Sequence, residues 1–173
     1  MKFFILSIFG KDKPGIVASL SRVLFELGLN LEDSSMTRLK GEFTIMLTLS
    51  SDDESLGAED ILKALKPVEK ELGLFVVCKE LKDLECQPVE NLYRIVVFGK
   101  DKKGIVYSVS SLLASLGINI SDLRTEKRGD LYVMVIEGES AEDMYESLRA
   151  GLEALKESLG VDISLEKEEG VEM

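Results

Sequence analysis

The chain has 173 residues, of which 45% are apolar and 31% charged, a size that suits one average domain or two small ones. Asp and Glu number 32 against 21 Lys and Arg, so the net charge of −11 excludes the basic surface that direct nucleic-acid binding requires. The absence of His excludes Ser-His-Asp and Cys-His catalysis and imidazole metal sites, and Cys78 and Cys86 are too far apart for a CxxC ligand pair. We expect no cofactor, no metal and two reduced thiols in a cytoplasmic protein.

The first apolar run, residues 3–9, is rich in Phe and Ile and predicts a buried strand. This run is too short to span a membrane and is broken by Gly10-Lys11-Asp12-Lys13, so we expect neither a signal sequence nor a membrane segment. Residues 15–27 then predict an amphipathic helix, because their apolar side chains recur at helical spacing: Ile16, Leu20, Val23, Leu24 and Leu27.

Two strands around a tight turn at Lys40-Gly41 come next, since apolar and polar residues alternate over 43–49. A second helix is predicted by Ile61, Leu65, Val68 and Leu72, and Pro67 within it should kink or split it. A last strand covers about 74–81. Both helices end in Leu-Gly, and Gly allows the left-handed backbone that closes a helix.

The second half of the chain repeats the first. Residues 10–33 carry 14 identities in 24 with the segment 89 positions further on, and one residue is then lost at a turn where Gly41 aligns with Gly129. The repeat predicts a strand at 92–98, a tight turn at Arg128-Gly129 and a last strand at about 161–167. Its two helices again end in Leu-Gly and carry these apolar residues: Ile105, Val109, Leu112, Leu113 and Leu116 in the first, and Met144, Leu148, Leu152, Leu155 and Leu159 in the second.

The predicted order is strand-helix-strand-strand-helix-strand, twice. Right-handed crossovers turn this order into an α+β fold with two ferredoxin-like βαββαβ domains, each a four-stranded antiparallel sheet with two helices on one face. We expect domains at 1–82 and 91–168, a linker at 83–90 that contains Pro88, and an acidic tail at 169–173.

The loop after the first strand is the first candidate binding element. Asp12 is expected to cap the helix, Pro14 to lie in its first turn, and Gly15 to let a ligand approach the backbone. Free amides at a helix start suit a small carboxylate. The alternative is that these residues only start a helix.

Asn30 and Asn119 form the second candidate element. Both follow Leu-Gly-x after the first helix of their repeat, whereas the Leu-Gly pairs after the second helices are followed by other residues. A side-chain amide both donates and accepts, as a ligand with ammonium and carboxylate groups needs. The alternative is an Asn that bonds only its own loop.

The combination Gly-x-Asp-x-Pro-Gly-Ile-Val, a short amphipathic helix and Leu-Gly-x-Asn resembles the ACT domain, a small-molecule-sensing regulatory module. The resemblance covers residues 2–82 and 91–168, and Lys103 departs from it in place of the Pro. A chain of two such domains is similar to the family of stand-alone tandem ACT proteins that includes the glycine cleavage system transcriptional repressor. The resemblance implies that an amino acid binds at an interface between ACT domains, at residues carried over as Asp12, Lys13, Pro14, Gly15, Ile16, Val17, Asn30 and Leu31, and as Asp101, Lys102, Gly104, Ile105, Val106, Asn119 and Ile120.

These features together predict a regulatory amino-acid-binding protein that is not an enzyme and has no catalytic residues. We expect a homodimer that acts through a protein partner and contacts neither nucleic acid nor a membrane. Two alternatives stay open: an adaptor that has lost its ligand, and a free-standing regulatory subunit of a biosynthetic enzyme.

Overall fold

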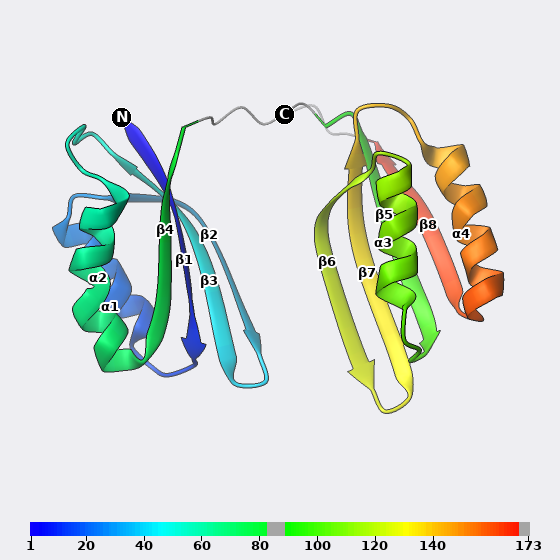
Figure 1. Ribbon diagram of the computed structural model, residues 1–173, viewed down its shortest axis with the longest axis horizontal. Coiled ribbons are helices and arrows are strands. Elements are labelled where there is room, and N and C mark those ends of the chain that lie inside the picture. Colours follow the sequence, from blue (N-terminus) through cyan, green and yellow to red (C-terminus); the bar gives the residue numbers. More distant parts are fainter. Residues whose placement is uncertain (83–88, 170–173) are drawn as a thin grey trace. The chain divides into compact units, whose positions relative to one another are not determined.

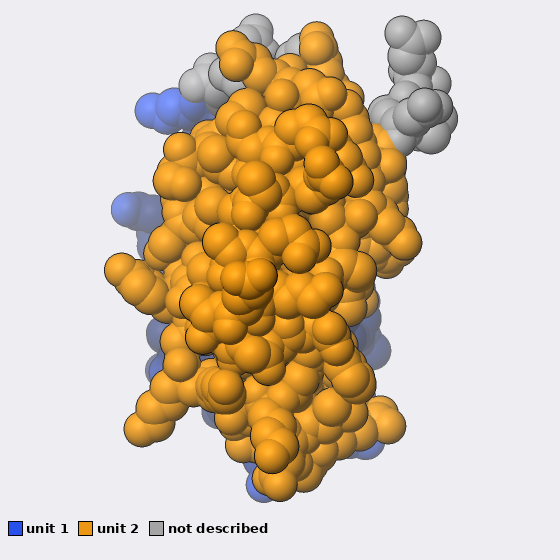
Figure 2. All heavy atoms as spheres, turned by 90° about the vertical axis from the view of Figure 1, so that its right-hand side faces the viewer, with its two compact units in different colours: residues 1–85 blue, residues 86–173 orange. Residues whose placement is uncertain are grey.

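The computed structural model describes residues 1–82 and 89–169 (Figure 1). The chain divides into two compact units, Met1–Glu85 and Cys86–Met173, named unit 1 and unit 2 below (Figure 2). Unit 1 consists of β1 (Lys2–Lys11), α1 (Ile16–Glu26), β2 (Asn30–Leu39), β3 (Glu42–Ser51), α2 (Ala58–Leu72) and β4 (Leu74–Leu81). Unit 2 consists of β5 (Asn91–Lys100), α3 (Ile105–Ser115), β6 (Asn119–Arg128), β7 (Leu131–Ser140), α4 (Tyr145–Leu159) and β8 (Asp162–Glu169).

Each unit is a four-stranded antiparallel sheet, with strand orders β2-β3-β1-β4 and β6-β7-β5-β8. In both units the two helices cover one face of the sheet (Figure 1). The predicted tandem βαββαβ fold is therefore confirmed. The first strand of each unit lies inside the sheet, while β2 and β6 are edge strands with one side unpaired.

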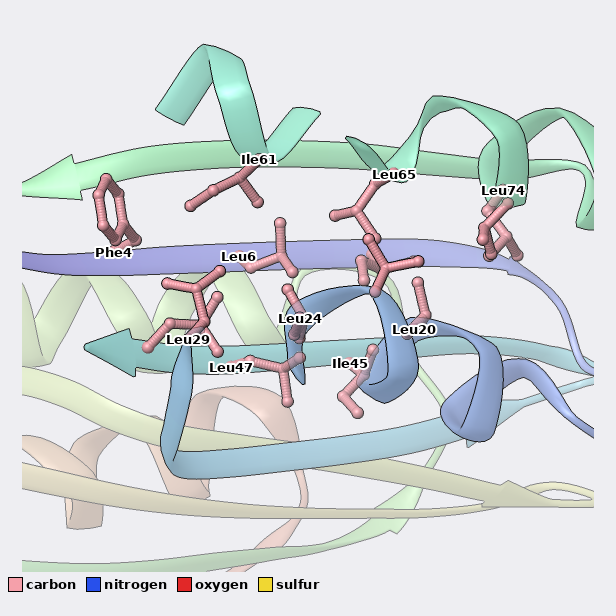
Figure 3. Close-up of a cluster of buried hydrophobic side chains, with 14 of the residues drawn as sticks. Phe4, Leu6, Leu20, Leu24, Leu29, Ile45, Leu47, Ile61, Leu65 and Leu74 are labelled. Atoms are coloured by element: carbon pink, nitrogen blue, oxygen red, sulfur yellow. The ribbon is translucent and has the colours of Figure 1, made fainter. Parts of the chain in front are cut away.

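The core of unit 1 follows from strand and helix periodicity. Alternate residues of β1 point toward the helices, and Phe4, Leu6 and Ile8 are fully buried there. Leu24 of α1 and Leu65 of α2 lie close to this row, and Leu47 joins them from β3 (Figure 3). Unit 2 has a separate core of the same kind, so each unit buries its own apolar face.

The two hairpins turn at equivalent positions, which corrects the predicted alignment. The turns are Lys40-Gly41 and Gly129-Asp130, so the offset of 89 persists through β3 and β7. Two residues are lost later, between the third strand and the second helix, where 52–57 correspond to 141–144. Aligning the glycines was misleading because the turn requires a positive φ at its first position, which Lys40 (φ 50°) and Gly129 (φ 61°) both adopt.

Pro67 does not split α2, so this part of the expectation was wrong. The helix is continuous from Ala58 to Leu72 although Pro67 lies inside it. Pro removes one backbone hydrogen bond, but Leu65 and Val68 on either side of it are buried in the core. This burial holds both halves of the helix on the sheet.

Several predicted segments fall at the ends of the units. Glu169 is the last residue of β8 and not the start of a tail, and residues 170–173 lie outside the described residues. Most of the predicted linker, 83–88, also lies outside them, as does Cys86. In the part of the chain that the structure describes, no helix is both long and apolar enough to span a membrane.

Gly151 marks a close contact between the two helices of unit 2. A Cβ at this position would lie 2.5 Å from Cδ1 of Leu112, whereas unit 1 has the smaller Val23 and the larger Ala64 at the equivalent positions.

We expect Gly151→Ala to destabilise unit 2 by about 1 kcal/mol. Overpacking against Leu112 costs about 1–3 kcal/mol, and the higher helix propensity of Ala offsets about 1 kcal/mol of that cost. Adding Leu112→Val should restore the stability, because it recreates the size pairing of unit 1. Urea denaturation of both variants measures this, and a Gly151→Ala chain more stable than the wild type would contradict it.

Candidate functional site

The Asp of the loop after β1 ties that loop to the neighbouring hairpin. The carboxylate of Asp12 pairs with the Arg38 guanidinium at 3.3 Å, and the Asp12 amide donates to the carbonyl of Gly41 at 2.9 Å. Within residues 1–82 and 89–169, no side chain caps α1, whose N-cap residue is Gly15. The prediction that Asp12 caps the helix was therefore wrong: a cation on β2, distant in sequence, engages its carboxylate instead.

Unit 2 repeats this arrangement. Asp101 forms a short ion pair with Lys127, the counterpart of Arg38, and its amide donates to the carbonyl of Asp130 at 3.0 Å. The hydrogen bond and the negative charge of Asp101 raise the pKa of Lys127 above its ordinary value. The Asp in each loop thus has a structural partner of its own.

Both first helices begin at a glycine with a left-handed backbone, at φ 89° for Gly15 and 94° for Gly104. A side chain at either position would be strained, since L residues rarely adopt such a φ. Pro14 precedes the helix, in the turn that leads into it, and so does not occupy the first helical turn as expected.

The backbone amides at these helix starts are available to a ligand. Among the described residues, no acceptor takes the amides of Gly15, Ile16 and Val17 or those of their counterparts Gly104, Ile105 and Val106. The Ile side chain is buried in each unit and anchors the turn, while Val17 is half exposed. Unpaired amides at the positive end of a helix form a site for an anion.

The predicted site lysines hydrogen-bond to the second helix of their unit. The ammonium of Lys13 donates to the carbonyl of Leu72 at 3.3 Å, and that of Lys102 donates to the carbonyl of Leu159 at 2.9 Å. Each lysine therefore satisfies the C-terminal end of the second helix, where a positive charge is favourable.

Asn30 and Asn119 are the first residues of β2 and β6, and each donates its amide to a glutamate. The distance is 2.8 Å from Asn30 to Glu32 and 2.9 Å from Asn119 to Glu139. Glu32 also accepts from the hydroxyl of Ser50, and these two hydrogen bonds hold its pKa below the ordinary range. Sequence reasoning missed both glutamates, because the predicted alignment of Gly41 with Gly129 paired Ser50 with Gly138 and so hid the relation between Ser50 and Glu139.

The helix start and the Asn lie at opposite ends of one unit. Gly15 follows the end of β1, α1 runs back over the sheet for 11 residues, and Asn30 begins β2 after it (Figure 1). Since 11 residues make a helix about 16 Å long, no single amino acid can contact both ends. One unit therefore cannot hold the predicted ligand with both elements at once.

A small cavity lies between α1 and the strands β2 and β3 of unit 1. Its volume is about 80 Å³, and Val17 and Leu31, both among the predicted residues, contribute to its lining together with Ser21 and Ser34. Leu31 is 45% exposed, and every residue of β2 is exposed. Ile120, the counterpart of Leu31, is partly buried.

Cys78 offers no nucleophile. Its side chain is half-buried on β4, and burial raises the pKa of the thiol to about 11. The thiol therefore stays protonated near neutral pH, and protonated thiols are unreactive.

The ACT domain model matches residues 2–79 and 94–166 of the chain. A UPF0237 protein of Corynebacterium glutamicum is 36% identical over 74 residues, which cover 43% of this chain and 83% of that protein. The glycine cleavage system transcriptional repressor of Escherichia coli is 27% identical over 122 residues, which cover 70% of this chain and 63% of the repressor. The crystal structure of an unknown protein from Galdieria sulphuraria covers 96% of this chain and 98% of its own, with a TM-score of 0.81 and 29% identity.

The matched segments include both loops after the first strands and both Asn residues. The chain therefore belongs to the ACT domain family: it carries two ACT domains in tandem and is related to the glycine cleavage system transcriptional repressor.

Proposed function

We propose that this chain is a non-catalytic regulatory protein that binds a free amino acid where two ACT units meet. The observation that carries the proposal is a pair of polar elements present in both units: unpaired amides at the start of the first helix, and an exposed Asn amide at the start of the next strand. The amides suit a carboxylate, and the Asn suits the remaining polar groups of an amino acid.

A second ACT unit completes the site. Because the two elements lie at opposite ends of one unit, a ligand that contacts both must take the helix start from one unit and the Asn from another. The edge strand β2 is exposed along its length and unpaired on one side, as an edge that accepts a neighbour would be. We expect a second copy of the chain to supply that neighbour, which makes the protein a homodimer.

The bound state is read by another protein. The net charge of −11 disfavours direct contact with DNA or an anionic membrane, so any effect on transcription or metabolism passes through a protein contact in the cytoplasm. Binding stabilises the assembled form, which shifts the association equilibrium that the partner senses.

Equilibrium dialysis of the purified chain against the twenty common amino acids tests this proposal. We expect one or two of them to bind with Kd below about 1 mM, which corresponds to about −4.1 kcal/mol. If none binds below that concentration, the sensing function is wrong and an adaptor without a ligand replaces it. Co-purification with a biosynthetic enzyme would instead indicate a free-standing regulatory subunit.

A further inference from the structure

Glu32 and Glu139 occupy different positions in the repeat but contact the same group. At the offset of 89, Glu32 of unit 1 aligns with Ser121 of unit 2, and Ser50 of unit 1 aligns with Glu139. Glutamate and serine have thus exchanged places between the two units, while the contact from the Asn amide to a carboxylate is kept.

The strand register explains how two positions reach one Asn. Asn30 lies opposite Ser50, and Asn119 lies opposite Glu139, so the cross-strand neighbour supplies the carboxylate directly in unit 2. In unit 1 the carboxylate comes from β2 itself, where the register shifts between Leu31 and Ser34 and Glu32 reaches both Asn30 and Ser50. Moving the carboxylate from one strand to the other requires two substitutions.

Folding stability does not explain why both units keep the contact between Asn and Glu. Asn30, Glu32 and Asn119 are exposed and Glu139 is partly exposed, and polar pairs at such positions contribute little to the stability of a fold. Of the groups involved, only Ser50, which donates to Glu32, is buried. A contact that reappears from two different strands at an exposed site is better explained by a ligand that requires it.

The chemistry of the pair fits a cation. Once the Asn amide nitrogen donates to the Glu side chain, the Asn carbonyl oxygen remains as an acceptor beside the carboxylate. Two acceptors with a negative charge suit an ammonium group, which has three donors, and repel a carboxylate.

We propose that Glu32 and Glu139 are equivalent residues that orient the Asn amide and accept the ammonium group of the bound amino acid. This assignment rests on the proposed function and gives the ligand a direction: its carboxylate lies at the helix start of one unit, and its ammonium lies at the Asn–Glu pair of another. Ligands without the α-amino group should bind poorly.

The parent for the test is the full chain with Asn119→Ala, in which the pair of Asn30 and Glu32 in unit 1 is the Asn–Glu pair that remains. Three variants are made in this parent. Glu32→Ser removes the carboxylate, Glu32→Ser with Ser50→Glu places it where unit 2 has it, and Glu42→Ser removes an exposed glutamate elsewhere on the same sheet. Each is titrated calorimetrically with the twenty common amino acids, and with carboxylic acids that lack the amino group, such as acetate beside glycine and propionate beside alanine. Far-UV circular dichroism verifies folding.

We expect Glu32→Ser to weaken amino-acid binding about 10- to 100-fold, as for other hydrogen bonds to charged groups. The exchanged variant should return to within about threefold of the parent, and Glu42→Ser should bind like the parent. The deaminated acids should not bind measurably.

A folded Glu32→Ser chain that binds like its parent, or an exchanged variant that stays as weak as Glu32→Ser, overturns the assignment while leaving the proposed function intact. Binding of none of the amino acids to the wild-type chain overturns both.

Discussion

Replacing Asn30 and Asn119 together by Ala is expected to remove most of the stabilisation that a bound amino acid confers on the chain. A ligand at a hundredfold excess over its Kd stabilises the folded state by about 2.7 kcal/mol. Losing a hydrogen bond to a charged group costs about 1.5–3 kcal/mol, so a hundredfold weaker Kd at the same ligand concentration leaves only about 0.4 kcal/mol of that stabilisation.

A thermal-shift assay with and without the twenty amino acids measures this loss. Thr37→Ala is the control, since Thr37 is exposed on the same edge strand and lies opposite Thr44 near the far end of that strand. The ligand-free melting temperatures of all three chains should agree closely, because both Asn residues are exposed. An unchanged ligand-induced shift in the double variant would exclude Asn30 and Asn119 from the site.

Leu65→Ala is expected to destabilise unit 1 by about 2–5 kcal/mol and to leave unit 2 unchanged. Leu65 is fully buried in the core of unit 1, where Ala would leave a cavity. The core of unit 2 shares no residue with it. Leu152→Ala, at the equivalent position of α4, should produce the reverse pattern.

The chain supplies a probe that separates the two units. All four Tyr residues lie in unit 2 and the chain has no Trp, so Tyr fluorescence reports only unit 2. In urea denaturation of Leu65→Ala, the part of the circular-dichroism transition that reports unit 1 should shift to lower urea concentration. The midpoint of the Tyr fluorescence transition should stay unchanged. A Tyr transition that moves together with that of unit 1 would mean that the units unfold as one.

The hydrophobic pattern was sufficient to predict the fold. Most strands and helices appear where alternation and helical spacing occur, whereas β2, which is exposed along its length, follows from the tight turn beside it. Gly28, Gly73, Gly117 and Gly160 all have the positive φ that a helix end requires. These signals are local, so the sequence displays them without the tertiary structure. The repeat showed the same elements a second time in the second half of the chain, which indicated two domains.

The errors concern side chains whose partners are distant in sequence. Asp is a residue type that often caps helices, and Asp12 lies just before one. Its partner Arg38, however, is 26 residues away in sequence and comes into reach only when the hairpin folds beside the loop. Pro67 breaks an isolated helix, but burial of Leu65 and Val68 outweighs that cost. In both cases tertiary contacts decided between local alternatives.

The position of each candidate element along the chain follows from the sequence, but the distance between the elements within a unit does not, and the placement of the ligand between ACT units stays a prediction. The free amides near Gly15 and the exposed Asn30 are where they were expected, yet the length of α1 separates them. The exchange of Glu32 and Ser50 with Ser121 and Glu139 becomes visible only at the corrected offset of 89, because the predicted alignment of Gly41 with Gly129 paired Ser50 with Gly138. Recognising that exchange as one contact, however, requires the strand register.

In the proposed function, one amino acid contacts the helix start of one ACT unit and the Asn of another. The most direct test is a ¹⁵N-labelled spectrum of the chain titrated with each of the twenty common amino acids. We predict that a binding amino acid shifts the backbone amides of Gly15, Ile16 and Val17 together with the side-chain amide of Asn30, or the equivalent set in unit 2, although about 16 Å of helix separates these groups within a unit. Shifts confined to one of the two ends, or no shifts with any amino acid, would contradict a shared site.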